Sequence, residues 1–207
     1  MSARRIICHW TAGAQQPSAD DVKHYHYLVA HMHGDTDEPD DDWAKLVVGV
    51  PVARNMRSLS GQPSFTRDPN RGYAAHTRGF NSWSIGVALC GMRGAQDFRD
   101  PRRASGGVHP GPAPITTLQI ESLIGLLVTL GAEHGLSPVK DQMFTHYEAQ
   151  SLHGKPQRGK WNITWLPHRP DMPADDVGPW LREQVQRMIA GKRLDLPDYW
   201  TDDGCFD

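Results

Sequence analysis

The sequence predicts an α/β protein with a mixed central β-sheet flanked by helices, and three observations support this prediction. Short β-branched runs that end in turn residues alternate along the chain with helical patterns. Residues 84–89 form a nearly continuous apolar run, which is typical of a strand in the middle of a sheet. Residues 116–135 carry the apolar pattern and both end signals of a long helix. With 207 residues, the chain suits a single domain.

The expected strands share β-branched or aromatic content and have turn residues at their ends. They cover residues 4–9, 25–29, 46–50 and 84–89. A short helix is expected to start at Ser18, and a long one at Thr116, where Gln119 completes a capping box. A third helix, over residues 179–190, would begin at Pro179. Its expected buried residues recur at helical spacing and are Leu181, Val185, Met188 and Ile189.

The connecting segments are rich in Gly, Pro and charged residues, and residues 54–80 and 93–114 are expected to be loops. The acidic residues 34–42 lack the regular ligand spacing of a calcium loop, so a solvated loop is expected there too. The three cysteines have no close spacing, which predicts neither a disulfide framework nor a zinc ribbon.

Charge and hydropathy exclude two classes of partner. The chain has 22 Lys and Arg residues against 24 Asp and Glu residues, so it lacks the basic field that non-specific nucleic-acid binding needs. No apolar run approaches the ~20 residues of a membrane-spanning helix, and we expect no membrane insertion. The N-terminal residues do not form a secretion signal, so we expect cytoplasmic synthesis.

Histidine is unusually abundant, with 11 residues in the chain. His9 ends the first expected strand and His146 follows the long helix. Neutral imidazoles at the ends of strands make good zinc ligands, although a single such histidine is more often structural. The remaining histidines outside the motifs below are assigned to surface or structure, namely His24, His31, His33, His109, His134, His153 and His168.

Five motifs occur in a fixed order: residues 6–13 (IICHWTAG), 24–29 (HYHYLV), 81–87 (NSWSIGV), 145–148 (THYE) and 159–164 (GKWNIT). In this combination the chain resembles the zinc-dependent N-acetylmuramoyl-L-alanine amidases. That family includes amidase-type phage endolysins and is related to the peptidoglycan recognition proteins. The resemblance extends from about Arg4 to Pro167.

The resemblance implies a Zn²⁺ site with three protein ligands and an open fourth position, in a cleft at the edge of the sheet. The implied ligands are His9, His146 and Asn162. The family usually has Asp or Cys where this chain has Asn162, and a neutral amide is a poorer zinc ligand. Three interpretations stay open: the site tolerates Asn, it holds zinc loosely, or the chain is an altered, less active form.

The resemblance also implies two catalytic residues. Lys160 matches the lysine that stabilises the oxyanion, and Tyr25 matches a tyrosine of the phage-type branch. A second branch uses a glutamate where this chain has Ala88, which favours Tyr25. His26, His76 and Asn81 are candidates for substrate contact or for support of the ligands.

The implied activity is hydrolysis of the amide bond between N-acetylmuramic acid and the L-alanine of the stem peptide. We expect a monomeric phage or prophage endolysin that acts on the bacterial cell wall after release or export. Residues 1–167 would form the catalytic domain, and residues 168–207 a helix and tail packed on it. Two alternatives remain: a peptidoglycan-binding module of the same fold with impaired catalysis, and a different metal hydrolase that uses the same histidines.

Overall fold

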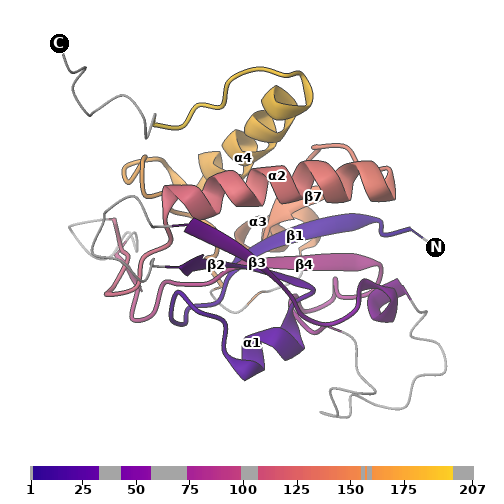
Figure 1. Cartoon of the computed structure of the whole chain (residues 1–207), viewed down its shortest axis with the longest axis horizontal. Coiled ribbons are helices and arrows are strands. Elements are labelled where there is room, and N and C mark those ends of the chain that lie inside the picture. The colour runs from indigo at the N-terminus through magenta and orange to yellow at the C-terminus, as the bar shows by residue number, and fades with distance from the viewer. Residues whose placement is uncertain are drawn as a thin grey trace.

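A computed structural model describes residues 2–32, 43–56, 74–98, 107–154, 157 and 160–197. Its centre is a five-stranded sheet in the order β3-β2-β4-β1-β7 (Figure 1). The strands are β1 (Arg5–Trp10), β2 (Tyr27–Met32), β3 (Trp43–Val48), β4 (Ser84–Leu89) and β7 (Met143–Thr145). Strands β2, β4, β1 and β7 run parallel, and β3 pairs with β2 in the antiparallel direction. The predicted mixed sheet is therefore confirmed.

The middle of the sheet is the most deeply buried part. All six residues of β4 are buried, as the continuous apolar run predicted. The edge strand β3 differs from the expected 46–50, since it begins at Trp43 and ends at Val48. Leu46 and Val48 of this strand are 49% and 65% exposed, and within the described ranges β3 is the last strand at this edge of the sheet.

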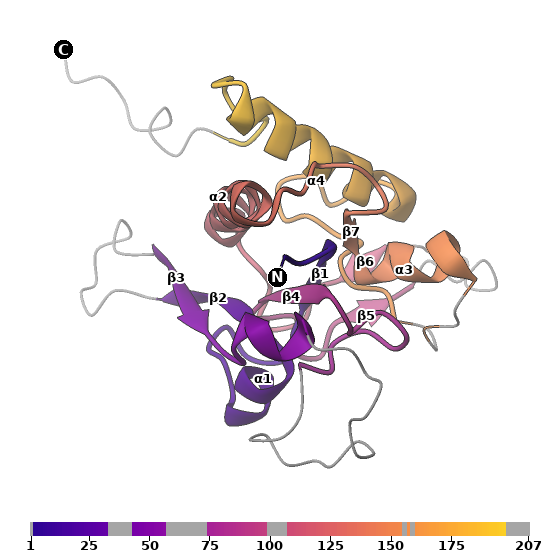
Figure 2. The same ribbon diagram turned by 90° about the vertical axis from the view of Figure 1, so that its right-hand side faces the viewer.

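Helices lie on both sides of the sheet (Figure 2). Helices α2 (Thr117–His134) and α4 (Ala174–Ile189) lie side by side over one face, and α1 (Ala19–His24) lies on the other side. Helix α3 (His146–His153) follows β7 directly, and the short 3-10 helix η2 (Val52–Met56) precedes the segment that leads to β4. None of the helices in the described ranges is long and apolar enough to span a membrane.

The predicted helix ends are confirmed where local capping decides them. Thr116 caps α2 through a reciprocal bond with Gln119, and Gly135 ends it in the left-handed conformation at φ 66°. Ser18 caps α1 in the same way with Asp21. The prediction of loops at residues 54–80 and 93–114 is partly wrong, because η2 covers 54–56 and a small hairpin pairs β5 (Gln96–Asp97) with β6 (Val108–His109).

The prediction for the C-terminal helix is wrong at its start. Helix α4 begins five residues before Pro179, which lies inside it. The carboxylates of Asp175 and Asp176 in its first turn stabilise the helix through the positive end of its dipole. Tertiary packing buries Val177 completely. Ile189, expected to be buried, is 60% exposed.

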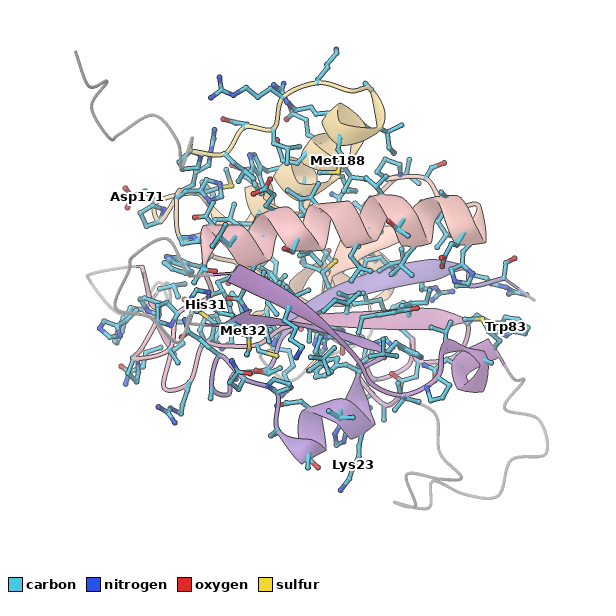
Figure 3. All side chains as sticks on the ribbon, in the orientation of Figure 1. Lys23, His31, Met32, Trp83, Asp171 and Met188 are labelled. Carbon is cyan, nitrogen blue, oxygen red and sulfur yellow. The ribbon has the colours of Figure 1, made fainter. Side chains whose placement is uncertain are left out.

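Helix α4 shares the main core with the sheet and α2. Val177, Trp180, Leu181 and Val185 belong to the same cluster of buried residues as Ile6, Val87 and Leu127. Met188 packs against this cluster, whereas Lys23 of α1 points into solvent (Figure 3).

Within the described ranges, Cys8 and Cys90 are free and buried, and burial raises the pKa of each thiol to about 12. The third cysteine and the acidic residues 34–42 lie outside the described residues.

Candidate active site

The two histidines predicted as metal ligands meet at the carboxyl ends of neighbouring parallel strands. His9 is the fifth residue of β1, and His146 is the first residue after β7. The register pairs Cys8 with Thr145, which brings the two rings to a centroid distance of 4.7 Å. Both residues are buried, with 0% and 5% exposure. Strand pairing thus joins two residues that lie far apart in the sequence.

Burial leaves both imidazoles neutral. Burial lowers the pKa of His146 to about 4 and holds that of His9 well below its usual value, and the positive charge of Lys160 acts in the same direction on both. The Nε2–H of His146 donates to Oε1 of Gln157 over 3.1 Å. This bond leaves Nδ1 of His146 with a free electron pair, the form that binds a metal.

Asn162, the third predicted ligand, lies beside both rings. Its amide raises the pKa of His9 and of His146, which opposes the effect of burial. Its side-chain Nδ2 donates to the Trp10 backbone carbonyl at 3.3 Å. Its backbone carbonyl accepts the Tyr147 N–H at 2.7 Å. These two bonds tie Asn162 to the end of β1 and to the first turn of α3.

Four buried atoms in and around this cluster have no partner among the described residues: Nδ1 of His9, Oδ1 of Asn162, Nε2 of His26 and Nε2 of His76. The first two belong to residues predicted as metal ligands. Buried polar atoms are nearly always satisfied in native proteins, so a pair of unsatisfied acceptors at one point indicates a ligand. No group of three or more His, Cys, Asp or Glu side chains in the described ranges could hold a metal ion. Among the described residues, the donors that meet at this point are two imidazoles and one amide oxygen, and the amide is the weaker ligand for a metal ion.

The two predicted catalytic residues also lie at this site. The ring of Tyr25 is 5.2 Å from that of His9, and burial raises the pKa of its hydroxyl, which therefore stays protonated and can donate a hydrogen bond. The side chain of Lys160 is exposed, yet its charge acts on both imidazoles. One hydroxyl donor and one accessible cation thus accompany the two imidazoles and the amide.

His26, His76 and Asn81 lie around or behind His9. Nδ1 of His76 is 3.2 Å from Nε2 of His9. Nδ1 of His26 accepts the Gly86 N–H at 2.8 Å, and this ring is fully buried. Oδ1 of Asn81 accepts the Thr77 N–H at 2.7 Å. These bonds suit residues that position the ligands, and the complete burial of His26 removes it from direct contact with a large substrate.

Sequence reasoning missed three polar residues that hold the site together. Thr77 contacts both His9 and His76, at 3.2 and 2.9 Å. Gln157 sets the tautomer of His146, and Asn55, 1% exposed, holds the backbone of the segment that carries His76. Thr77 directly follows His76 and lies four residues before Asn81, so its place beside two candidate site residues could have identified it from the sequence. Gln157 and Asn55 have no comparable pattern in the sequence.

The buried histidines predict that the fold loses stability in acid. Burial lowers the pKa of His26 to about 4, so between pH 6.5 and 4 the unfolded chain binds a proton that the folded chain does not. Stability is therefore full above pH 6.5 and falls as the pH drops, by about 2 kcal/mol between pH 7 and 5 from His26 alone. Urea unfolding at pH 7, 6 and 5 in the presence of a chelator measures this slope. His26→Gln should make the free energy of unfolding depend less steeply on pH. An unchanged dependence in that variant would contradict the contribution of His26.

Comparison with known proteins identifies a family. A sequence profile of the N-acetylmuramoyl-L-alanine amidases matches residues 1–161. Among solved structures, the chain is similar to the N-acetylmuramyl-L-alanine amidase AmiD from E. coli, in complex with the substrate anhydro-N-acetylmuramic acid-L-Ala-D-gamma-Glu-L-Lys. Sequence identity is 20% and the TM-score is 0.45, with 74% of this chain and 52% of that chain covered, so the chain spans about half the length of that protein. No curated protein sequence matches the chain.

Proposed function

Because the chain belongs to the N-acetylmuramoyl-L-alanine amidase family, we propose that it hydrolyses the amide bond between N-acetylmuramic acid and L-alanine in bacterial peptidoglycan. The observation that carries this proposal is the meeting of His9, His146 and Asn162 around two unsatisfied buried acceptor atoms. Amide hydrolysis needs an activated water and a group that stabilises charge on the carbonyl oxygen. The site has residues for both.

Zinc is the cofactor that we propose, held by Nδ1 of His9, Nδ1 of His146 and Oδ1 of Asn162. When bound, it would lower the pKa of a water molecule and polarise the substrate carbonyl. Hydrogen bonds to the second nitrogen of each imidazole orient the two rings for this role. Gln157 accepts the Nε2–H of His146, and Nδ1 of His76 lies where it can accept the Nε2–H of His9. Such outer hydrogen bonds fix the tautomer and orientation of a metal-binding histidine.

Lys160 and Tyr25 are the residues that we propose to act on the substrate. Lys160 is a cation with an exposed side chain near both imidazoles, so it can approach the scissile carbonyl oxygen and stabilise the negative charge that develops there. The hydroxyl of Tyr25 stays protonated and its ring lies 5.2 Å from that of His9, so it can donate a hydrogen bond to the attacking water or to the same oxygen.

Identification of the cleaved bond tests the activity. Purified peptidoglycan digested by the zinc-loaded protein should yield free L-alanine amino groups and intact glycan strands, which mass spectrometry and amino-group labelling detect. New reducing sugar ends would show a glycosidase instead, and new D-amino-acid termini would show an endopeptidase. The endolysin role stays a prediction. It is tested by expression in bacteria with and without a pore-forming holin, with lysis expected only in the first case.

A peptidoglycan-binding module with impaired catalysis is the second candidate, and the amide at position 162 is the observation that favours it. Asn162→Asp separates the two, because it places an anionic oxygen where the neutral one lies. We expect the zinc dissociation constant to fall by about tenfold or more, the scale on which single changes around a metal alter its affinity. Zinc titration against a competing chelator measures the change, beside a wall-lysis assay at matched zinc.

Gln186→Glu is the control for this substitution. It adds the same negative charge on the exposed face of α4 and should leave zinc affinity unchanged. If Asn162→Asp raises lysis together with affinity, Asn162 is a tolerated ligand in an active enzyme. If lysis stays absent at saturating zinc in both forms, the binding module is the better description. Equal zinc affinity in the two forms would mean that Asn162 is not a ligand.

A further inference from the structure

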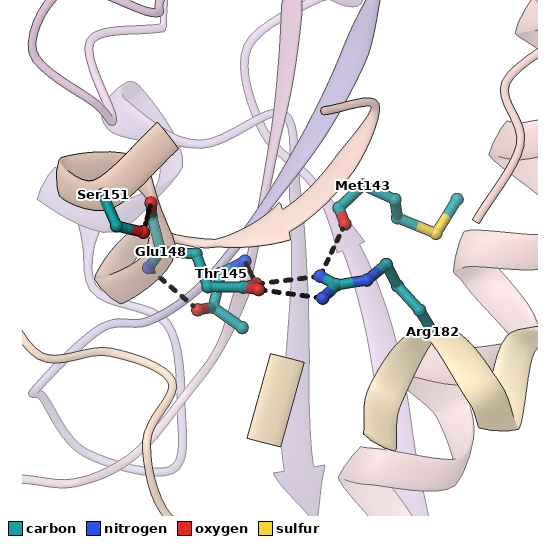
Figure 4. A network of polar contacts seen from close by, with 5 residues as sticks. All are labelled: Met143, Thr145, Glu148, Ser151 and Arg182. Atoms are coloured by element: carbon teal, nitrogen blue, oxygen red, sulfur yellow. Dashed lines mark hydrogen bonds and ion pairs between the residues drawn. The ribbon is translucent and has the colours of Figure 1, made fainter. Parts of the chain in front are cut away.

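A buried ion pair joins the C-terminal helix to the helix that begins at His146 (Figure 4). Nη1 and Nη2 of Arg182, on α4, donate to Oε2 and Oε1 of Glu148, on α3, and both distances are 2.9 Å. The residues are 9% and 5% exposed, so water screens the pair little. A two-pronged contact of this kind fixes the orientation of the carboxylate as well as its position.

Glu148 also belongs to the capping box of α3. Its Oε2 accepts the Thr145 N–H at 2.9 Å, and Oγ1 of Thr145 accepts the Glu148 N–H at 3.3 Å. His146 lies between these two residues in the chain. The conformation of the first turn of α3, and with it the direction of the His146 side chain, therefore depends on where the Glu148 carboxylate is held.

Arg182 holds the preceding strand as well. Its Nη1 donates to the carbonyl oxygen of Met143, the first residue of β7, at 3.1 Å. One guanidinium thus contacts the chain on both sides of His146: the strand that leads to it and the carboxylate of the turn that follows it (Figure 4).

The packing between the two helices accommodates this contact. Gly178 of α4 lies against the Glu148 carboxylate, and a β-carbon at this position would overlap the carboxylate oxygens. Burying an ion pair seldom adds net stability compared with apolar residues of similar size. Stability alone is therefore a weak reason for this pair, whereas the orientation of the turn that carries His146 depends on it directly.

We propose that Arg182 is a positioning residue for the metal site, acting through Glu148 on the imidazole of His146. This inference rests on the proposed function, in which His146 binds zinc. Arg182 lies beyond residues 1–161, the part of the chain that the family profile matches. The C-terminal helix is then a functional part of the site in this protein, and its removal would impair metal binding.

Zinc affinity measured on folded protein tests the proposal. Arg182→Gln removes the charge and the two-pronged contact, and Arg182→Lys retains the charge with a single donor group. Arg187→Gln, a change of the same kind on the same helix, is the matched control, since the Nε–H of Arg187 donates to the Arg193 carbonyl at 2.9 Å. We expect Arg182→Gln to raise the zinc dissociation constant by about 10- to 100-fold, Arg182→Lys by less, and the control to leave it unchanged.

A second readout needs no metal. In the zinc-free protein, the ¹⁵N chemical shifts of the His146 imidazole should change in Arg182→Gln and in Glu148→Gln, and their effects should not add, because both act on one contact. Near-ultraviolet circular dichroism shows at which temperature each variant is folded. If Arg182→Gln does not fold, Arg182→Lys and Glu148→Gln carry the test.

The outcomes separate this proposal from the proposed function. A lower melting temperature with unchanged zinc affinity and unchanged His146 shifts would reduce Arg182 to a stabilising residue and overturn the proposal. If the wild type and His146→Ala bind zinc equally, the metal role of His146 is wrong. The effect of Arg182 on the imidazole of His146 is then still decided by the shifts in the zinc-free protein.

Discussion

His9→Ala and His146→Ala should each abolish wall lysis and lower kcat/KM by at least about a thousandfold, because either change removes one of the two nitrogen ligands that we propose for the metal. The loss should be accompanied by loss of bound zinc. A turbidity assay on purified walls gives the activity, and metal analysis after gel filtration gives the zinc content of each variant.

The fold should survive both substitutions. His9 is fully buried, so its truncation leaves a cavity that costs about 1–3 kcal/mol, less than the total stability of a typical domain. His24→Ala is the control, since this histidine lies on the outer end of α1, where its ring contacts the Asp20 carbonyl. Full lytic activity in His9→Ala or His146→Ala would remove the metal from the mechanism.

Asn55→Ala should destabilise the protein by about 3–5 kcal/mol, since it leaves several buried backbone groups unsatisfied at about 1–3 kcal/mol each. The two N–H bonds of Nδ2 of Asn55 are shared among the carbonyl oxygens of Ala74, Asn81 and Ser84, at 3.1, 2.9 and 3.2 Å. Its Oδ1 accepts the Ala74 N–H at 2.7 Å. Denaturant unfolding measures the loss, and zinc affinity should fall with it because this segment also carries His76.

A comparison with an exposed amide isolates the cause. Gln186→Ala removes an amide from the surface of α4 and should change the free energy of unfolding by less than about 0.5 kcal/mol. Asn55→Asp retains the acceptor for the Ala74 N–H but loses the donor and buries a charge, so it should be no more stable than Asn55→Ala. A loss below about 1 kcal/mol in Asn55→Ala would mean that water replaces the amide, and that the segment is held by other contacts.

Elements whose signals are local could be predicted from the sequence. The ends of α2 depend on Thr116, Gln119 and Gly135, which act within a few residues of each other. Helix α4 shows the limit of such rules. Pro179 favours a helix start on local grounds, but Asp175, Asp176 and the packing around Gly178 place the start five residues earlier.

In the candidate site, too, some features could be predicted from the sequence and others could not. His9 could be found because it lies near the end of a recognisable strand, and His146, Asn162, Lys160 and Tyr25 because their motifs resemble a family. The sequence could not show that the His146 imidazole is oriented by Gln157. Strand β7, with three residues, is also too short for its periodicity to be visible.

By itself, the sequence determined the class of fold, the capped helices and the buried central strand, because each of these depends on side-chain type and short-range spacing. It indicated the residues proposed to do the chemistry through the resemblance of its motifs to a family. Only the tertiary structure decided which polar groups meet. Asn55 reaches the segment before β4, and Arg182 reaches Glu148 across 34 positions of the chain. Such contacts form because parallel strand pairing and the packing of α4 bring distant segments together, and no local pattern in the sequence specifies those distances.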